Sequence, residues 1–279
     1  MICGSRAVIK YLLFTLSLFA GCSPSWAINP TDPRDPNCIF AVDFREGRDG
    51  IARDMSQSKL DVKLNGITWY ESDQVFQQFS DFSYQIQPSS LTYAPVFGHG
   101  VFMTPTTGID AETISTTTAF NFNGNRPFMM AWVVWSRLKG NVGVQTSVFS
   151  YTQAANACGF SLEYAAGTVI NGNFVLTGVG GPIFWPTTRS DTVPHMYWIW
   201  RDESGHVVIG YDGKRTREFT GVADFNTCSG GSQLVFGRAK TGAAGEFGGG
   251  FGPFWIWNKA VEKANLDNFM KSWYDALFD

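Results

Sequence analysis

The chain has 279 residues, of which 44% are hydrophobic, 15% aromatic and only 16% charged, and its formal net charge is −3. This composition excludes a disordered chain, which needs low hydrophobicity and high net charge. The negative net charge, with no visible cluster of Lys or Arg, argues against a nucleic-acid-binding protein. The only long apolar run is at the N-terminus, which argues against a polytopic membrane protein. A globular protein with one large domain remains.

The N-terminal segment is predicted to be an export signal. Residues 1–27 combine a positively charged start with the apolar run Tyr11–Gly21, and small residues follow. Two processing routes remain open: Cys22 fits a lipoprotein signal and would be lipidated, whereas Ala27 ends a small-x-small cleavage site. An uncleaved anchor is a third route. The sequence therefore predicts export to the periplasm, the outer surface or the extracellular space, with membrane contact only through a lipid or the uncleaved signal.

The rest of the chain reads as a tether followed by a β-rich domain. Residues 28–37 contain three prolines and no apolar period, so they are predicted to be an extended tether. Residues 38–279 are predicted to form one domain, in which Asn171-Gly172 and Asp212-Gly213 are hairpin turns. Ten segments have the alternation or the β-branched and aromatic content typical of strands: Ile39–Phe44, Ser115–Phe122, Phe128–Arg137, Val144–Tyr151, Gly159–Tyr164, Asn173–Gly178, Tyr197–Arg201, His206–Tyr211, Gln233–Gly237 and Phe254–Trp257.

The last segment has the period of an amphipathic helix rather than of a strand. Its apolar residues are spaced to share one helical face: Leu266, Phe269, Met270, Trp273 and Leu277. Asn258 is its predicted N-cap. The predicted fold class is therefore all-β, a two-sheet antiparallel jelly-roll sandwich with one C-terminal helix.

The order of several motifs resembles that of a known family. The motifs are Val42–Gly47, Ala52–Ser56, Asn123–Trp132, His195–Trp200, Val208–Lys214, Leu234–Arg238 and Phe254–Asn258. As an ordered set they resemble the laminin G-like branch of the concanavalin A-like lectin/glucanase superfamily, over about residues 39–275. The resemblance implies a concanavalin A-like sandwich. It says little about function, because this fold carries lectins, glycosidases, lyases, protein-binding modules and structural domains.

The cysteines predict one disulfide. Cys3 leaves with the signal, and Cys22 is either lipidated or removed. Cys38, Cys158 and Cys228 remain, an odd number, so an oxidising compartment would give one disulfide and one free thiol. The spacing does not identify the pair. No C-x-x-C occurs, so no zinc ribbon or thioredoxin-type site is indicated.

No catalytic set is recognisable, so the sequence favours a non-catalytic role but leaves open whether the chain is an enzyme. A retaining glycosidase needs two carboxylates about 5 Å apart, and the nearest acids are Asp110 with Glu112 and the adjacent pair Asp202-Glu203. The first pair is interpreted as a solvated edge and the second as a hairpin turn. The three histidines, His99, His195 and His206, are interpreted as structural. The Gln-x-His motif of a lyase and the Gly-x-Ser-x-Gly motif of a serine hydrolase are both absent.

Calcium is the one cofactor that the resemblance brings into consideration. Lectins and laminin G-like domains often hold calcium through Asp and Asn side chains and carbonyl oxygens. Asp43, Asp49 and Asp54 are the candidate ligands here. No EF-hand-like spacing supports them, and such clusters also form turns.

The ten tryptophans and 24 phenylalanines are the most unusual feature. Trp198 and Trp200 alternate along one predicted strand, and Trp255 and Trp257 along another, so each pair shares a face. They either pack in the core or form a platform for stacking on a sugar or binding an apolar partner. Because a two-sheet core cannot easily hold so many rings, some are predicted to be exposed.

The leading hypothesis is an exported, non-catalytic binding module that recognises a glycan or glycoconjugate through aromatic stacking, with or without calcium. The alternative is a structural subunit that docks through an apolar face onto an envelope protein or a larger membrane-associated complex. A polysaccharide hydrolase or lyase with an unfamiliar site is the third hypothesis. Nucleic acid is not an expected partner.

Overall fold

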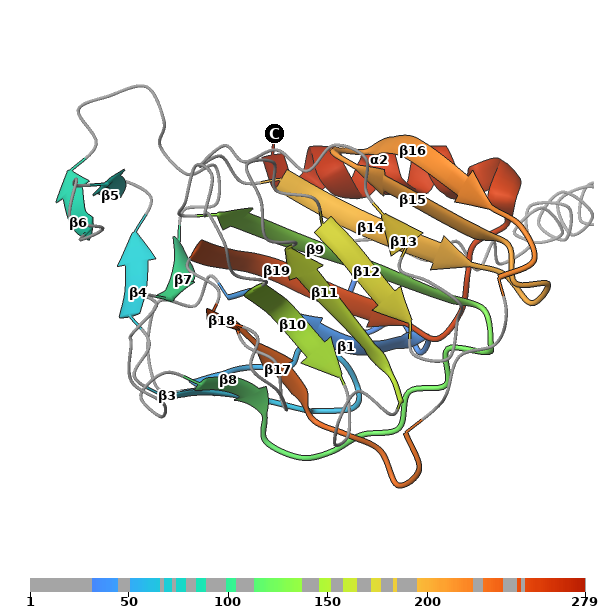
Figure 1. The fold of residues 1–279 in the computed structure, drawn as a ribbon, viewed down its shortest axis with the longest axis horizontal. Coiled ribbons are helices and arrows are strands. Elements are labelled where there is room, and N and C mark those ends of the chain that lie inside the picture. The colour runs from blue at the N-terminus through green and yellow to red at the C-terminus, as the bar shows by residue number, and fades with distance from the viewer. Residues whose placement is uncertain are drawn as a thin grey trace, which may run out of the picture.

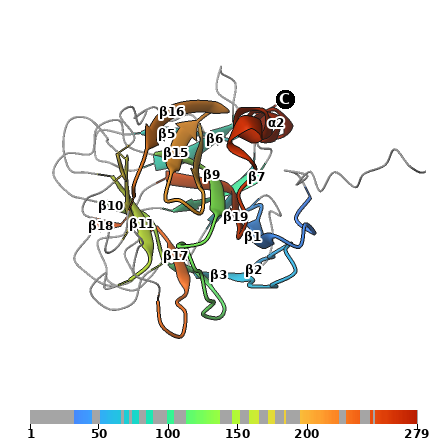
Figure 2. The same ribbon diagram turned by 90° about the vertical axis from the view of Figure 1, so that its right-hand side faces the viewer.

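In the computed structural model, two β-sheets pack face to face and a helix covers the outside of one of them (Figure 1, Figure 2). The structure describes residues 32–44, 51–65, 68–71, 74–78, 84–88, 99–103, 113–136, 146–151, 158–164, 172–176, 183–184, 195–222, 228–237, 245–246 and 249–278. The predicted signal, Cys22 and the start of the tether lie outside the described residues. No helix within the described ranges is both long and apolar enough to cross a membrane.

The first sheet, sheet A, has the strand order β16-β15-β14-β9-β19-β7-β4. β7 pairs with the first residues of β19, and β1 pairs with its last residues. Its strands are β16 (Lys214–Phe219), β15 (Val207–Tyr211), β14 (His195–Arg201), β9 (Phe128–Ser136), β19 (Gly249–Trp257), β7 (His99–Met103), β4 (Thr68–Glu71) and β1 (Cys38–Val42). All of its pairs are antiparallel.

The second sheet, sheet B, has the order β13-β12-β11-β10-β17-β8-β3-β2, and β18 pairs in parallel with β10. Its strands are β13 (Ile183–Phe184), β12 (Gly172–Leu176), β11 (Phe160–Tyr164), β10 (Thr146–Tyr151), β17 (Leu234–Phe236), β8 (Thr113–Thr116), β3 (Val62–Asn65), β2 (Ile51–Ala52) and β18 (Gly245–Glu246). In a separate two-stranded sheet, β5 (Gln74–Gln78) pairs antiparallel with β6 (Tyr84–Pro88). The prediction of a two-sheet antiparallel sandwich with one C-terminal helix is confirmed.

The central strands of sheet A are buried on both faces, because one apolar core packs against each face. Tyr197 and Ile199 of β14 face the core between the two sheets. Trp198 and Trp200, at the alternate positions, face a second core under helix α2 (Leu266–Phe278). All seven residues of β14 are consequently buried. Figure 2 shows α2 on the side of sheet A that faces away from β10 and β11.

Of the two predicted hairpin turns, the structure confirms one and contradicts the other. Asp212 and Gly213 both have positive φ, 48° and 68°, as a two-residue type I′ hairpin requires, and they join β15 to β16. The Asn171-Gly172 prediction is wrong as a two-residue turn. Gly172 pairs with Tyr164, so the connection between β11 and β12 is longer.

The predicted helix start and tether also need correction. Asn258 is not the N-cap of the helix, because the 3₁₀ turn η2 (Lys263–Asn265) comes first and α2 begins only at Leu266. The described part of the tether, residues 32–37, is not extended. The N–H of Asp35 donates to the carbonyl of Asp32 at 3.2 Å, and the N–H of Cys38 donates to the carbonyl of Asp35 at 2.8 Å. These hydrogen bonds fold the segment into successive turns.

Candidate functional site

A cavity of about 320 Å³ lies where four separate segments of the chain meet. They are the first residues of β1, the connection between β2 and β3, the connection between β8 and β9, and the residue that follows β19. The lining residues are Ile39, Ser58, Leu60, Phe120, Asn121, Phe122, Asn123, Arg126 and Asn258. The volume is at the lower end of the range of about 300–1,000 Å³ for small-ligand pockets.

The lining combines an apolar floor with a polar rim. Ile39, Leu60 and Phe120 are partly buried and pack against the inter-sheet core. The polar lining side chains, Ser58, Asn121, Asn123, Arg126 and Asn258, are exposed. An amide both donates and accepts hydrogen bonds, a hydroxyl does the same, and a guanidinium only donates. The rim can therefore bind a ligand rich in hydroxyl or oxyanion groups.

Asp54 fixes the wall formed by the β2–β3 connection. It is 2% exposed, and its Oδ1 accepts from the N–H groups of Ala41 and Ser56, each at 2.9 Å. Its Oδ2 accepts from the Ser56 hydroxyl at 2.9 Å and the Leu60 N–H at 2.7 Å. Four protein donors thus satisfy a buried carboxylate and hold Leu60 at the cavity.

This arrangement bears on the predicted calcium ligands. The hydrogen bonds of Asp54 give its carboxylate a structural task, Asp43 is partly exposed, and Asp49 lies outside the described residues. Within the described part of the chain, no three His, Cys, Asp or Glu side chains are grouped to hold a metal ion. Calcium binding therefore stays a prediction.

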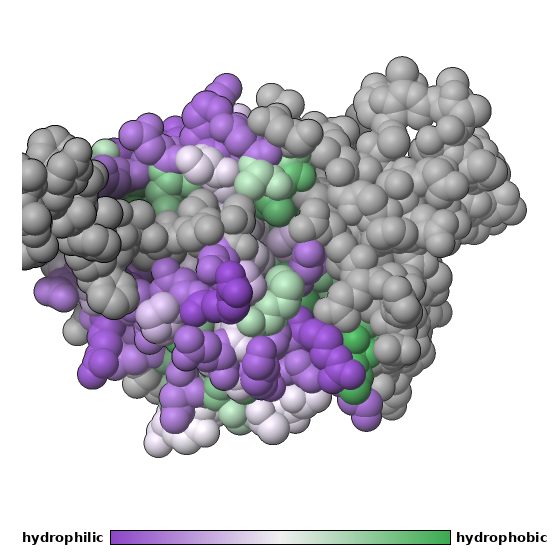
Figure 3. Space-filling model, turned by 180° about the vertical axis from the view of Figure 1, so that it is seen from behind, coloured by the Kyte–Doolittle hydropathy of each residue, from purple (hydrophilic) through white to green (hydrophobic). Residues whose placement is uncertain are grey.

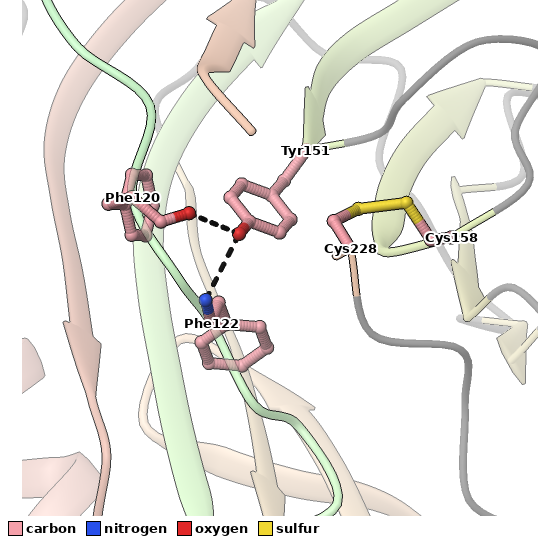
Figure 4. The surroundings of a disulfide bond; sticks show 5 residues. All are labelled: Phe120, Phe122, Tyr151, Cys158 and Cys228. Atoms are coloured by element: carbon pink, nitrogen blue, oxygen red, sulfur yellow. Dashed lines mark hydrogen bonds between the residues drawn. A yellow bond between two sulfur atoms is a disulfide. The ribbon is translucent and has the colours of Figure 1, made fainter. Parts of the chain in front are cut away.

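Tyr151 fixes the wall formed by the β8–β9 connection (Figure 4). Its hydroxyl donates to the carbonyl of Phe120 and accepts from the N–H of Phe122 at 3.0 Å. Its ring lies 4.9 Å from that of Phe120 and stacks on Phe160 at 5.3 Å, measured between ring centroids. Burial raises the pKa of the phenol, which keeps the proton on the hydroxyl.

A second brace reaches the same wall from the turn before β17. The N–H of Phe120 donates to the carbonyl of Ser232 at 3.0 Å, and the Ser232 N–H donates back at 3.1 Å. Gly231 has a φ of 80°, and a Cβ there would lie 2.5 Å from the carbonyl oxygen of Phe120. Glycine thus allows the turn to approach the cavity wall closely.

A disulfide anchors this turn. Cys158 and Cys228 are bonded, with their Cα atoms 5.1 Å apart, and the carbonyl of Cys228 accepts from the N–H of Gly231 at 2.9 Å. Cys38 is a free, buried thiol, and its burial raises its pKa to about 12. One disulfide and one free thiol is the predicted outcome, and the structure identifies the pair. Figure 4 shows the disulfide beside Tyr151 and the Phe120–Phe122 segment.

The remaining wall is held by the N-terminal segment. The N–H of Asn258 donates to the carbonyl of Asn37 at 2.9 Å. The Gln57 side chain, next to Ser58 in the sequence, donates to the carbonyl of Arg34 at 3.2 Å. The turns of residues 32–37 therefore support two sides of the cavity.

The four tryptophans predicted to bind a ligand lie elsewhere. Trp198, Trp200, Trp255 and Trp257 are at most 6% exposed and belong to the core under α2. The rings of Trp255 and Trp257 contact each other and Trp273 of the helix, and the indole N–H of Trp200 donates to the carbonyl of Val261 at 2.8 Å. These side chains form a core between sheet and helix and not an exposed stacking platform.

Asp202, His195 and His206 have structural contacts, whereas Glu203 is exposed on the β14–β15 turn. The Asp202 carboxylate accepts from the Ser204 hydroxyl and from the N–H groups of Ser204 and His206, which shapes the β14–β15 turn. His195 Nδ1 lies 2.6 Å from Asp212 Oδ2. His206 Nε2 lies 3.2 Å from Glu218 Oε2. Asp110 and Glu112 lie outside the described residues, as does the side chain of His99.

Sequence reasoning missed every residue of the cavity rim as a site residue. Asn123 and Arg126 lie within one of the motifs that resemble the laminin G-like branch, and Asn258 is predicted from the sequence to be a helix N-cap. The available signal was the density of amides and one guanidinium in the Asn121–Arg126 loop. A loop rich in exposed polar side chains is a common place for binding residues.

Comparisons with known proteins give structural neighbours only. No protein-family model and no curated protein matches the sequence. The binding domain of botulinum neurotoxin DC in complex with rat synaptotagmin II is similar at a TM-score of 0.57 and 12% identity, over 86% of this chain and 52% of that one. The same domain in complex with SialylT gives 0.54 and 10%, over 86% and 52%.

A third structure concerns botulinum neurotoxin type C, whose cell entry is described as dependent on interaction with two ganglioside molecules. It gives a TM-score of 0.53 and 11% identity, over 85% of this chain and 51% of that one. The chain thus spans about half the length of these structures. At such low identity the likeness shows a shared β-sandwich fold and does not identify the laminin G-like branch.

Proposed function

We propose that this chain is an exported, non-catalytic module that binds a glycan or glycoconjugate in the cavity between the β2–β3 and β8–β9 connections. The observation that carries this proposal is the lining: five exposed polar side chains surround a floor of Ile39, Leu60 and Phe120. A sugar has hydroxyl groups around its edge and apolar C–H groups on its faces. The rim suits the hydroxyls and the floor suits one face of the ring.

The hydrogen bonds that fix two facing walls of the cavity support a binding role for it, rather than its being a gap in packing. Asp54 holds one wall through four hydrogen bonds. Tyr151 and Ser232 hold the facing segment through four more. A cavity whose walls are already fixed loses little conformational entropy when a ligand binds.

The structural neighbours are consistent with this proposal. Their names refer to SialylT, to gangliosides and to a receptor protein. Those chains are about twice as long as the region matched here, so the likeness alone does not show that this chain binds the same ligands.

Export is part of the proposal. The Cys158–Cys228 disulfide is the kind of bond that persists in oxidising compartments. The predicted signal at residues 1–27 would deliver the chain there, either lipid-anchored at Cys22 or released after Ala27.

The assembly-subunit alternative requires an exposed apolar face. The coloured part of the face seen from behind is mostly hydrophilic, with small hydrophobic areas between the polar ones (Figure 3). This surface therefore does not favour docking onto an envelope complex, and the binding experiment distinguishes the two functions.

The test is retention of the mature protein on an array of immobilised oligosaccharides and polysaccharides, with and without EDTA. We expect selective retention of wild type, and about tenfold weaker retention of the double variant Asn121→Ala/Asn258→Ala, which removes two rim amides. Loss with EDTA would add calcium to the site. Absence of retention on every glycan would contradict the proposal and favour the assembly role.

A further inference from the structure

We propose that the cavity selects an acidic sugar, whose carboxylate binds the guanidinium of Arg126. This inference rests on the proposed function and specifies the chemical class of its ligand. Three observations support it: the charge of the lining, the hydrogen bonds that hold the Arg126 loop, and the contacts that already engage the neighbouring carboxylates.

The lining is positive although the whole chain is negative. Arg126 is the one charged residue among the nine that line the cavity, and no carboxylate is among them. The formal net charge of the chain is −3. A local excess of positive charge in a partly enclosed site attracts anions, and low-dielectric walls strengthen the effect.

Arg126 differs from the arginines that are engaged in ion pairs or in buried hydrogen bonds. Arg34 pairs with Asp32, Arg53 with Asp61, and Arg215 with Glu218 and Asp267. Arg201 is 1% exposed and donates to backbone carbonyls. Arg126 is exposed and has no ion-pair partner in the part of the chain that the structure describes. Its guanidinium is therefore available to a ligand.

The acids of the neighbouring wall do not compete for Arg126. Asp54 is satisfied by its four donors within the β1–β3 region. Asp61 accepts from the N–H of Asp54 at 2.9 Å through one oxygen, and from Arg53 at 2.9 Å through the other. A ligand carboxylate would thus meet a wall whose negative charges are already engaged.

Hydrogen bonds from another strand and within the loop hold the loop that carries Arg126. Arg201 of β14 donates through Nη1 to the carbonyl of Gly124 at 3.1 Å. Within the loop, Asn123 Oδ1 accepts from the N–H of Asn125 at 3.1 Å, and the N–H of Arg126 donates to the carbonyl of Asn123 at 3.3 Å. These contacts fix the turn before β9 and reduce the entropy lost on binding.

The same contacts bias the rim toward hydrogen-bond donation. The Asn123 side-chain oxygen accepts from the N–H of Asn125, and the two amide hydrogens of the same side chain remain as donors for a ligand. Together with the guanidinium of Arg126, three residues further along the same loop, they give this part of the lining more hydrogen-bond donors than acceptors. A planar fork of N–H groups matches the two oxygens of a carboxylate, so a sugar acid fits this part of the lining better than a neutral sugar.

The test uses the mature protein and matched pairs of oligosaccharides: sialyllactose with lactose, digalacturonate with its dimethyl ester, and lactose with sulfated lactose. Affinities are measured by titration calorimetry for wild type, Arg126→Gln, Arg126→Lys and the control Arg217→Gln. The control removes the same charge from an exposed position on β16, where Arg217 lies over the ring of Phe219. The thermal midpoint of each variant confirms that it is folded.

We expect carboxylated probes to bind and their neutral partners to bind at least tenfold more weakly. Arg126→Gln lowers the affinity for the acidic probe by about tenfold to a hundredfold, Arg126→Lys by less, and Arg217→Gln leaves it unchanged. Equal binding of neutral and acidic sugars, or wild-type affinity in Arg126→Gln, overturns the inference and leaves the proposed glycan function standing. Binding of sulfated lactose alone overturns the carboxylate assignment. Failure of all these sugars to bind overturns the inference, and it overturns the proposed function as well only when the glycan array also retains nothing.

Discussion

Tyr151 connects the inter-sheet core to the cavity through one hydroxyl group. Its ring is fully buried between the sheets, and its hydroxyl holds both Phe120 and Phe122. A tyrosine at this place therefore combines packing energy with a precise restraint on the backbone of a loop. Phenylalanine would keep the packing and lose the restraint.

We predict that Tyr151→Phe lowers the free energy of unfolding by about 1–2 kcal/mol, because the N–H of buried Phe122 and the carbonyl of partly buried Phe120 each lose a hydrogen bond to the hydroxyl, while the carbonyl keeps the one from Ser232. It should also weaken glycan binding, because the Phe120–Phe122 wall loses a brace. Urea denaturation measures the first effect and titration calorimetry the second. Tyr211→Phe, on a partly exposed ring, is the control. Unchanged stability in Tyr151→Phe would show that the hydroxyl does not hold the wall.

At the scale of elements, helix α2 explains the excess of aromatic residues. A sandwich alone offers one core, but α2 gives sheet A a second buried face, filled by Trp198, Trp200, Trp255, Trp257 and Trp273. Burial of a large aromatic side chain typically contributes about 3–5 kcal/mol relative to alanine. The helix is therefore an integral layer of the domain and not an appendage.

A charged seam ties this layer to the outer edge of sheet A. Lys263 donates to Glu218 Oε2 at 2.7 Å, and Arg215 binds both Glu218 and Asp267. The Lys263 hydrogen bond first, and the Arg215 contacts next, lower the pKa of Glu218 from 4.5 to about 2. A lowered pKa in the folded state means that this contribution to stability is complete above pH 4.5 and is lost as the pH falls toward 2.

We predict that Glu218→Gln removes part of the acid sensitivity of folding. Between pH 4.5 and pH 2, the difference in unfolding free energy between wild type and variant should shrink as the wild-type carboxylate becomes protonated. The effect is small, because the seam is partly exposed to solvent. Thermal unfolding across this pH range measures it, with Glu203→Gln on the β14–β15 turn as the control. A constant difference at every pH would refute the ionic role of Glu218.

At the scale of the whole molecule, the Cys158–Cys228 disulfide links the start of β11 to the turn that supports the cavity wall at Phe120. Cys158 precedes β11 and Cys228 begins the turn that pairs with Phe120. The two residues are 70 apart in sequence, so the bond closes a long loop in the unfolded chain.

We predict that Cys158→Ser/Cys228→Ser lowers the free energy of unfolding by about 2–4 kcal/mol and weakens glycan binding through the loosened turn. Cys38→Ser is the control for thiol chemistry, because the Cys38 side chain is buried and protonated. Guanidinium denaturation and calorimetry of the same samples provide the two readouts. Wild-type affinity in a destabilised double variant would mean that the disulfide supports the fold but not the cavity.

The fold was largely predictable because local patterns decide it. The alternation in β14 and the Asp212-Gly213 turn identify adjacent strands directly, and the spacing of Leu266 to Trp273 identifies the helix. The exposed edge strand β16, KRTREF, is not among the ten predicted strands because it lacks an apolar alternation, and only the hairpin turn before it points to it. The boundaries set by capping, as at Asn258, were also wrong.

The site was not predictable, for two physical reasons. Alternation shows that Trp198 and Trp200 share a face, but not that a helix more than sixty residues later covers that face. The cavity, in turn, is made by residues from Ile39 to Asn258 that meet only in the folded chain. A local sequence pattern does not show which distant residues come together in the fold.

The most direct test of the glycan-binding cavity is to block it. Ser58→Trp places a large ring at an exposed position of the rim, and Ser272→Trp places the same ring on an exposed position of α2. Titration calorimetry with the best-retained glycan should show binding weakened by about tenfold or more in Ser58→Trp and unchanged in Ser272→Trp. Wild-type affinity in a folded Ser58→Trp variant would contradict the account.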